Sequence, residues 1–328
     1  MDQKAFRSIT PIFNFTLGTD FSHSGAFKEA SFNISLRKYE PGKKSYDELM
    51  KYADKTSRSQ LTSIHIYTKG PMILAEFFLV VDVIHPSNED LKVSTNSYES
   101  VHILKTILDS LRLHSSNGLL CDKTFYFSFP QHSHGGTAYG SPLINQNPFL
   151  HLNGLSVLRE SEFEKCRSTF DILLNKKWNN NVTLDKLLVL AIEYHKAVFS
   201  FQAIEHGFLI LMVIFEALFK KDNNENRTQA SMRISKLISV AKKDQKKIHK
   251  EFSVDTNNFY DLRNNIAHGD PSLDQAVIKT KYKALYQYIT MAIIKLISIT
   301  DGQVNHGVNY YDEVTRLIDR HFNALPST

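Results

Sequence analysis

The sequence predicts an α+β protein in two parts, a mainly antiparallel sheet domain followed by an all-α helical bundle. Two observations lead to this prediction. Before about residue 150, apolar residues recur with a period of two, which is typical of half-buried strands. After that point they recur with the period of a helix, in segments joined by short polar loops. We therefore expect two domains, 1–150 and 151–328.

The first part contains several short segments in which apolar and polar residues alternate, at 13–17, 32–36, 64–66 and 125–129. A longer, mostly apolar segment, 72–84, indicates a more buried strand, and 97–114 has the pattern of one amphipathic helix. The stretch 130–148 is rich in Gly, Pro, Ser and Asn, which indicates a linker or a long loop. We expect this domain to serve in sensing, substrate choice or partner binding.

The second part shows helical periodicity in six segments, 160–177, 183–201, 203–221, 228–243, 245–269 and 273–299. Short polar loops between helices are typical of bundles, so these segments predict one helical domain. The segment 203–221 is almost wholly apolar and suits a helix in the core of that domain.

Composition excludes several classes of protein. With 328 residues, 42% hydrophobic and 22% charged, the chain has the composition of a globular protein rather than a disordered one. A formal charge of +5 favours anionic partners only mildly. Cys121 and Cys166 form neither a disulfide framework nor a metal-ligand spacing, which favours a reducing cytoplasm. We see no secretory signal, and the longest apolar run, Phe208–Phe215, is too short for a bilayer, so we predict a cytoplasmic protein with no membrane partner.

The segment "NFYDLRNNIAHGD", 258–270, gathers polar residues on one side of an expected helix. At about 100° per residue, Phe259, Leu262 and Ile266 form an apolar stripe. Asn264 and His268, four residues apart, then lie side by side on nearly the opposite face. Gly269 follows as the residue that ends the helix.

The side chains of this segment suit RNA cleavage. His268 can move a proton near neutral pH, and Arg263 offers a permanent, forked set of donors to a phosphate. Asn264 can position the phosphate or the imidazole without titrating. The alternative is an amphipathic helix end with a histidine near the negative end of the helix dipole, and spacing alone favours that explanation.

The run Arg263–His268 resembles the R-polar-x-x-x-H signature of the HEPN superfamily, and the preceding text resembles its ApeA-like subgroup. In that subgroup an apolar helix ends in a Glu-Ala-Leu-Phe run, then come a polar loop and an arginine on the next helix. Here these are "FEALF" at 215–219, "KKDNNENRTQ" and Arg233. The resemblance covers roughly residues 155–300. It implies a metal-independent endoribonuclease without a cofactor, a dimer with two Arg/His sets at a shared cleft, and a place in a prokaryotic defence or toxin system.

Glu216 interrupts the apolar helix, where a lone carboxylate is costly without a partner. Glu205 lies eleven residues earlier on the same face, so both carboxylates could simply reach solvent along a polar edge. Alternatively, Glu216 pairs with Arg263 or His268 and fixes its orientation, as the resemblance suggests.

Lysines precede the motif, among them Lys242, Lys243, Lys246 and Lys247, and they could guide an RNA backbone toward it. A plain solvated loop is the alternative. His132 and His134 have no third ligand nearby, so we predict no metal site.

The resulting prediction is an endoribonuclease that leaves a 2′,3′-cyclic phosphate and a 5′-hydroxyl. His268 would be the acid or base, Arg263 the phosphate stabiliser, Asn264 the positioning group and Glu216 the orienting group. Its expected partners are RNA, with tRNA one candidate, a second copy of the chain bound through the helical domain, and an antitoxin or phage-derived trigger. The alternative is a HEPN module without activity, serving dimerisation or the binding of RNA or a nucleotide.

Overall fold

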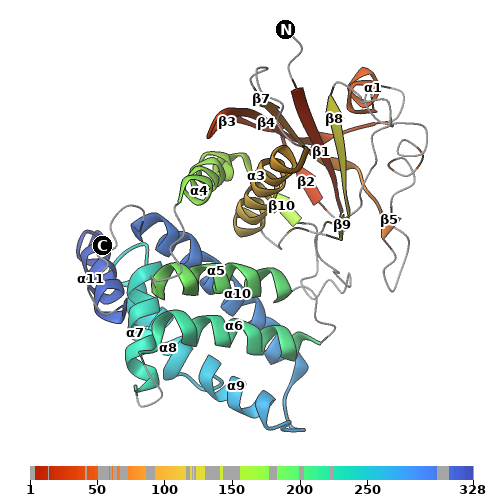
Figure 1. Cartoon of the computed structure of the whole chain (residues 1–328). Coiled ribbons are helices and arrows are strands. Elements are labelled where there is room, and N and C mark those ends of the chain that lie inside the picture. Colours follow the sequence, from red (N-terminus) through yellow and green to blue (C-terminus); the bar gives the residue numbers. More distant parts are fainter. Residues whose placement is uncertain are drawn as a thin grey trace. The chain divides into compact units, whose positions relative to one another are not determined.

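The computed structural model in Figure 1 contains two compact units, Met1–Asn175 and Lys176–Thr328. The structure describes residues 4–13, 15–40, 43–50, 59, 61, 65–66, 73–85, 93–115, 119, 121, 123–129, 141–142, 156–176, 183–198, 203–221, 225–300 and 310–327. The predicted linker, 130–148, therefore lies outside the described residues except for 141–142, and so do His132 and His134.

The first unit is built on a six-stranded sheet in the order β3-β4-β7-β1-β8-β9. Each described pairing between neighbours in this sheet is antiparallel, as predicted. The strands are β1 (Lys4–Ile12), β3 (Phe21–Phe27), β4 (Ala30–Lys38), β7 (Phe77–His85), β8 (Lys123–Phe129) and β9 (Ser141–Pro142). Two small pairs accompany it: β2 (Phe15–Leu17) runs parallel to β10 (Ser156–Leu158), and β5 (His65–Ile66) runs antiparallel to β6 (Ile73–Leu74).

Strand β7 is covered on both faces of the sheet, which explains the five consecutive apolar residues from Phe77 to Val81. The predicted single strand 72–84 is two strands, because β6 ends at Leu74 and β7 begins at Phe77. Between them lie Ala75 and the exposed Glu76, and the backbone carbonyl of Glu76 accepts a 3.0 Å hydrogen bond from the N–H of Tyr39.

The sheet has a different cover on each face. On one face pack α3 (Val93–His114) and α4 (Phe163–Asn175), which follows the short 3-10 helix η1 (Glu160–Glu162). On the other face, α1 (Lys44–Met50) contributes Leu49 and Met50 to a second, smaller apolar cluster. Alternation along β4 places Phe32, Ile34 and Leu36 in the first cluster. Ser35 and Arg37 therefore point to the α1 side.

The two compact units divide one helix after residue 150, the position at which the sequence pattern changes. Helix α4, expected to open the helical domain, buries Phe163, Cys166, Phe170 and Leu174 in the same cluster as the sheet and α3. The hydroxyl of Ser110 on α3 donates a 2.6 Å hydrogen bond to the carbonyl oxygen of Cys166. An amphipathic pattern shows that a helix has an apolar side but not which core that side joins. The two units divide after Asn175.

The second unit is a helical bundle, as predicted. Its helices are α5 (Thr183–Ala197), α6 (Ile204–Phe219), α7 (Arg227–Ile238), α8 (Asp244–Ser253), α9 (Phe259–Ala267), α10 (Gln275–Thr300) and α11 (Tyr310–Asn323). Helix α10 contacts α5, α6, α7, α9 and α11 (Figure 1). Where α6 meets α10, a Cβ on Gly207 would lie 2.9 Å from the Tyr282 ring, so only glycine permits this approach.

The predicted helical segment 245–269 is two helices. Helix α8 ends at Ser253 and α9 begins at Phe259, and Asn257 between them has a positive φ of 56°. Asparagine tolerates this left-handed conformation better than most residues, so it suits the reversal. No helix among the described residues is long and apolar enough to cross a membrane.

Candidate active site

Helix α9 is defined at both ends by local hydrogen bonds. At its start, the Asn258 side-chain oxygen accepts a 3.0 Å bond from the Asp261 N–H, while its amide donates to the Asp261 carboxylate at 2.6 Å. At its end, the His268 N–H donates to the Asn264 carbonyl at 3.0 Å, and Gly269 follows with φ of 67°. The helix is therefore nine residues long and stops one residue before His268.

Packing sets the rotation of α9 about its axis. Phe259 and Leu262 are buried, as the apolar stripe predicted, and Ile266 is half-buried. The Phe259 ring lies 4.8 Å from the Phe252 ring of α8 and 6.3 Å from the Phe208 ring of α6, centroid to centroid. Because this face is fixed against α6 and α8, the residues around Asn264 point outward.

Three of the predicted residues meet at the surface between α6 and α9. The Arg263 guanidinium lies 4.0 Å from a Glu216 carboxylate oxygen, and it donates a 3.2 Å hydrogen bond to the Asn264 side-chain oxygen. The Arg263 side chain is 40% exposed and that of Glu216 is 27% exposed. A charge-assisted hydrogen bond normally spans about 2.7–2.9 Å. At 4.0 Å, Glu216 attracts the guanidinium and orients it but does not occupy its donors with a hydrogen bond. Most of the guanidinium donors stay available to an anion.

His268 differs from its predicted setting. It was expected on the same helix as Asn264, yet α9 ends at Ala267 and His268 is the capping residue, with φ of −91°. The backbone bond to Asn264 still holds the two residues one turn apart. The ring is exposed and has no hydrogen-bond partner among the described residues. Glu216 pairs with Arg263, and the described residues show no ion pair between Glu216 and His268.

Tyr260 belongs to this cluster and was not predicted. Its side chain is buried, and its hydroxyl has no hydrogen-bond partner in the described part of the chain. Burial raises its pKa well above the usual value, and the charges of Glu216 and Glu225 raise it further. The hydroxyl therefore stays protonated at neutral pH. Tyr260 precedes Arg263 and Asn264 by three and four residues, so helical spacing alone could have identified it.

Of the four predicted RNA-contacting lysines, Lys246 and Lys247 lie on α8, whereas Lys242 and Lys243 lie in the turn before it. Lys246 and Lys247 are exposed on α8, and Lys243, also exposed, is its N-terminal capping residue. Lys242 is half-buried, and its backbone N–H donates to the carbonyl of Pro326 at 3.1 Å. Helix α8 contacts α9, so the exposed Lys246 and Lys247 lie on the helix next to the candidate site, and the exposed Lys243 lies at the start of that helix.

A pocket of about 500 Å³ opens where α9 ends, between the first turns of α6 and α10. Its lining includes Ala267 and Gly269, which flank His268, and apolar side chains of α6, α9 and α10. The lining is Glu205, His206, Leu209, Ile266, Ala267, Gly269, Asp270, Pro271, Leu273, Gln275 and Ile278. Glu205 accepts a 2.7 Å hydrogen bond from the Gln275 amide, so it belongs to this rim.

Arg233, the other arginine of the resemblance, is fully engaged elsewhere. It donates to both Glu225 carboxylate oxygens at 2.8 and 2.6 Å, to the carbonyl of Phe219 at 2.7 Å and to the Thr315 hydroxyl at 3.0 Å. It ties the end of α6 to α7 and α11 and takes no part in the Arg263 cluster.

No protein-family model, curated protein or solved structure gives a significant match to this chain.

Proposed function

We propose that the chain is a metal-independent endoribonuclease of the HEPN type, acting on RNA in a prokaryotic anti-phage defence or toxin system. The observation that carries the proposal is the cluster at α9: an unsaturated arginine, its neighbouring amide and an exposed histidine one turn away. These groups suit RNA cleavage by transesterification, because a cation can stabilise the charge on the phosphate and an imidazole can transfer the proton.

In the proposed reaction the ribose 2′-oxygen attacks phosphorus while the bond to the 5′-oxygen breaks. The 2′-hydroxyl loses a proton and the leaving 5′-oxygen gains one, and His268 serves one of these transfers. Arg263 stabilises the negative charge that grows on the phosphate oxygens, with Asn264 alongside and Glu216 holding the guanidinium in place. The products are a 2′,3′-cyclic phosphate and a 5′-hydroxyl.

Exposed apolar side chains favour assembly through the helical unit. Val213 is 43% exposed on α6, three residues before Glu216, and the neighbouring helix α5 exposes Val189, Leu190 and Tyr194. Apolar surface beside a polar site is typical of an interface. We propose a homodimer in which the second copy covers this face and excludes water from the two sites. The resemblance adds an antitoxin or a phage product as the controlling partner.

The first test is cleavage of end-labelled RNA by the purified protein with and without EDTA. We expect full activity in EDTA and cyclic phosphate ends, because the mechanism uses only side chains. His268→Ala should abolish cleavage, and His321→Ala, a histidine of α11 outside the site, should retain it. Activity that disappears with chelator and returns with magnesium would overturn the proposed chemistry.

The second test is the oligomeric state. We expect a dimer by sedimentation, and Val213→Asp should shift it toward monomer and lower cleavage with it. Mixing His268→Ala with wild type should reduce activity per wild-type chain as subunits exchange. A wild-type monomer that cleaves RNA at full rate would contradict the shared site.

The same apolar face supports one other function, a HEPN module that dimerises or binds RNA without cutting it. In that case Val213→Asp would still disrupt the dimer, while no RNA would be cleaved by wild type and His268→Ala would bind RNA as wild type does.

A further inference from the structure

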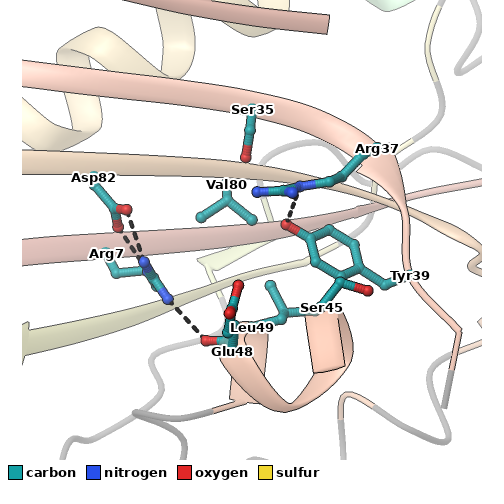
Figure 2. Close-up of a pocket in the computed structure, with 9 residues that line it drawn as sticks. All are labelled: Arg7, Ser35, Arg37, Tyr39, Ser45, Glu48, Leu49, Val80 and Asp82. Atoms are coloured by element: carbon teal, nitrogen blue, oxygen red, sulfur yellow. Dashed lines mark hydrogen bonds and ion pairs between the residues drawn. The ribbon is translucent and has the colours of Figure 1, made fainter. Parts of the chain in front are cut away.

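The sheet of the first unit carries a polar pocket of about 320 Å³ on the face that α1 covers (Figure 2). Three strands supply its floor and α1 supplies one wall. It is lined by Arg7, Ser35, Arg37, Tyr39, Ser45, Glu48, Leu49, Val80 and Asp82. Polar side chains on the covered face of a sheet need hydrogen-bond or ion-pair partners. The partners of each charged side chain in the pocket therefore show which of them can bind a ligand.

Arg7 is neutralised within the protein. Its Nε and Nη2 donate to the two Asp82 carboxylate oxygens at 2.6 and 2.8 Å, and its Nη1 donates to the backbone carbonyl of Glu48 at 3.2 Å. This forked pair joins β1 to β7 and to α1. It forms a fixed, neutral side of the pocket and leaves no charge there for a ligand.

Arg37 is oriented but not neutralised. Its Nε donates to the Tyr39 hydroxyl at 2.9 Å, and its guanidinium carbon lies 5.3 Å from the centroid of the buried Tyr39 ring. Within the described residues no carboxylate forms an ion pair with it. Figure 2 shows its guanidinium extending over the sheet toward the Arg7–Asp82 pair, with the Ser35 hydroxyl pointing toward it. The Nη donors of a half-buried cation thus face an open space.

The remaining charge is that of Glu48, which lines the pocket from α1 and is exposed. A carboxylate is an acceptor for hydroxyl groups and repels a bare anion. The pocket therefore offers donors at Arg37 and Ser35 and an acceptor at Glu48.

We propose that this pocket binds a small ligand carrying a phosphate monoester next to free hydroxyl groups. The phosphate is held by the Nη groups of Arg37 and the hydroxyl of Ser35, and a ligand hydroxyl donates to Glu48. A doubly charged phosphate gains more from one guanidinium than a carboxylate does, which offsets repulsion from Glu48. The volume is at the small end of ligand pockets, which suits a sugar phosphate or a nucleoside monophosphate. The proposal concerns the first unit alone and does not depend on the ribonuclease assignment.

The experiment is titration calorimetry of the full chain with ribose 5-phosphate, adenosine 5′-monophosphate, ribose and inorganic phosphate. We expect both phosphorylated sugars to bind at least tenfold more tightly than ribose or inorganic phosphate. Tighter binding of the nucleotide than of ribose 5-phosphate would identify a nucleotide site, and equal binding a sugar-phosphate site. Failure of both to bind at millimolar concentration would overturn the proposal.

Variants separate this pocket from general attraction of anions. Arg37→Gln should weaken binding of the tighter probe at least tenfold, while Arg159→Gln, an exposed arginine of the same unit outside the pocket, should change it less than twofold. Glu48→Gln should weaken ribose 5-phosphate and strengthen inorganic phosphate. Ser35→Asp, which gives Arg37 an internal counter-ion, should abolish binding even if Arg37→Gln does not fold. Equal losses in the two arginine variants, or wild-type binding by Ser35→Asp, would contradict the site.

Discussion

Two arginines of the helical unit, Arg233 and Arg263, lie in contrasting settings: one is fully hydrogen-bonded within the protein, and the other is partly exposed. The Arg233 side chain is 15% exposed and meets Glu225, Phe219 and Thr315 with four hydrogen bonds of 2.6–3.0 Å. The Arg263 side chain is 40% exposed, and its carboxylate partner lies at 4.0 Å. The Arg233 guanidinium uses its donors in hydrogen bonds within the protein, whereas most donors of the Arg263 guanidinium stay available to a ligand.

The difference separates a cation that holds the fold from one that can hold a ligand. A buried arginine must be fully paired, because an unpaired charge in the interior is costly. A surface arginine held loosely by one carboxylate is oriented at little cost and stays available. Sequence alone cannot make this distinction, since both arginines belong to the same resemblance.

The largest expected effect is a loss of the proposed RNA cleavage when the cluster around Arg263 is changed. Arg263→Ala and His268→Ala should each lower the cleavage rate by about 10²–10³-fold or more, as is typical for loss of a charge stabiliser or a general acid or base. The double variant should lose little beyond either single one, because both act on one transition state. Arg227→Ala, which removes an exposed ion pair with Asp261 nearby, should leave the rate nearly unchanged. Multiplicative losses would show that the two residues act separately.

The next effect is on stability at the Arg233 side. Arg233→Ala should lower the free energy of unfolding by about 3 kcal/mol, because it leaves Glu225, whose side chain is only 4% exposed, as an uncompensated charge. Urea denaturation measures the loss. Arg263→Ala, in contrast, should cost about 1 kcal/mol or less. Equal losses in the two variants would contradict the assignment of Arg233 to the fold and of Arg263 to ligand binding.

The smallest effect is the pH dependence that Glu225 confers. Burial raises its pKa, but hydrogen bonds from Arg233 and from the Lys221 N–H outweigh burial, and the net shift is downward from 4.5. The unfolded chain therefore binds the proton more readily than the folded one. This contribution to stability is complete above about pH 4.5 and is lost as pH falls through the lower folded value. Between about pH 4.5 and the lower folded value, the free energy of unfolding should fall more steeply for wild type than for Glu225→Gln, by at most about 1.4 kcal/mol per pH unit. Parallel curves would show that Arg233 does not hold this carboxylate in its charged form.

Much of the fold was readable because it rests on periodicity. The alternation at Phe32, Ile34 and Leu36 predicted a strand with one buried face, and the structure confirms it in β4. The stripe of Phe259 and Leu262 likewise predicted which side of α9 is buried. Periodicity cannot give the identity of the opposing core. The apolar side of α4 packs in the core of the first unit, and its helical spacing alone gave no sign of that.

The site was predicted in part for the same reason. Residues on one helix can be placed from spacing, so Asn264 was correctly expected on the exposed face. The pairing of Glu216 with Arg263 joins two helices, and spacing left open whether Arg263 or His268 would be the partner. The early end of α9 depends on Gly269 adopting a positive φ, and the predicted helix ran one residue too far. Tyr260 was missed because an aromatic residue beside Phe259 looks like core.

The brevity of α9 has a consequence for how the protein responds to heat. A helix of nine residues is too short to persist alone in water, where about 12–15 residues are needed even for favourable sequences. Helix α9 is therefore stabilised by the packing of Phe259 and Leu262 against neighbouring helices. Such a segment can detach in a local opening that leaves longer helices such as α10 intact. Amide protons of α9 should therefore exchange with solvent sooner than those of α10, and the proposed RNA cleavage should be lost on warming before the bundle itself melts.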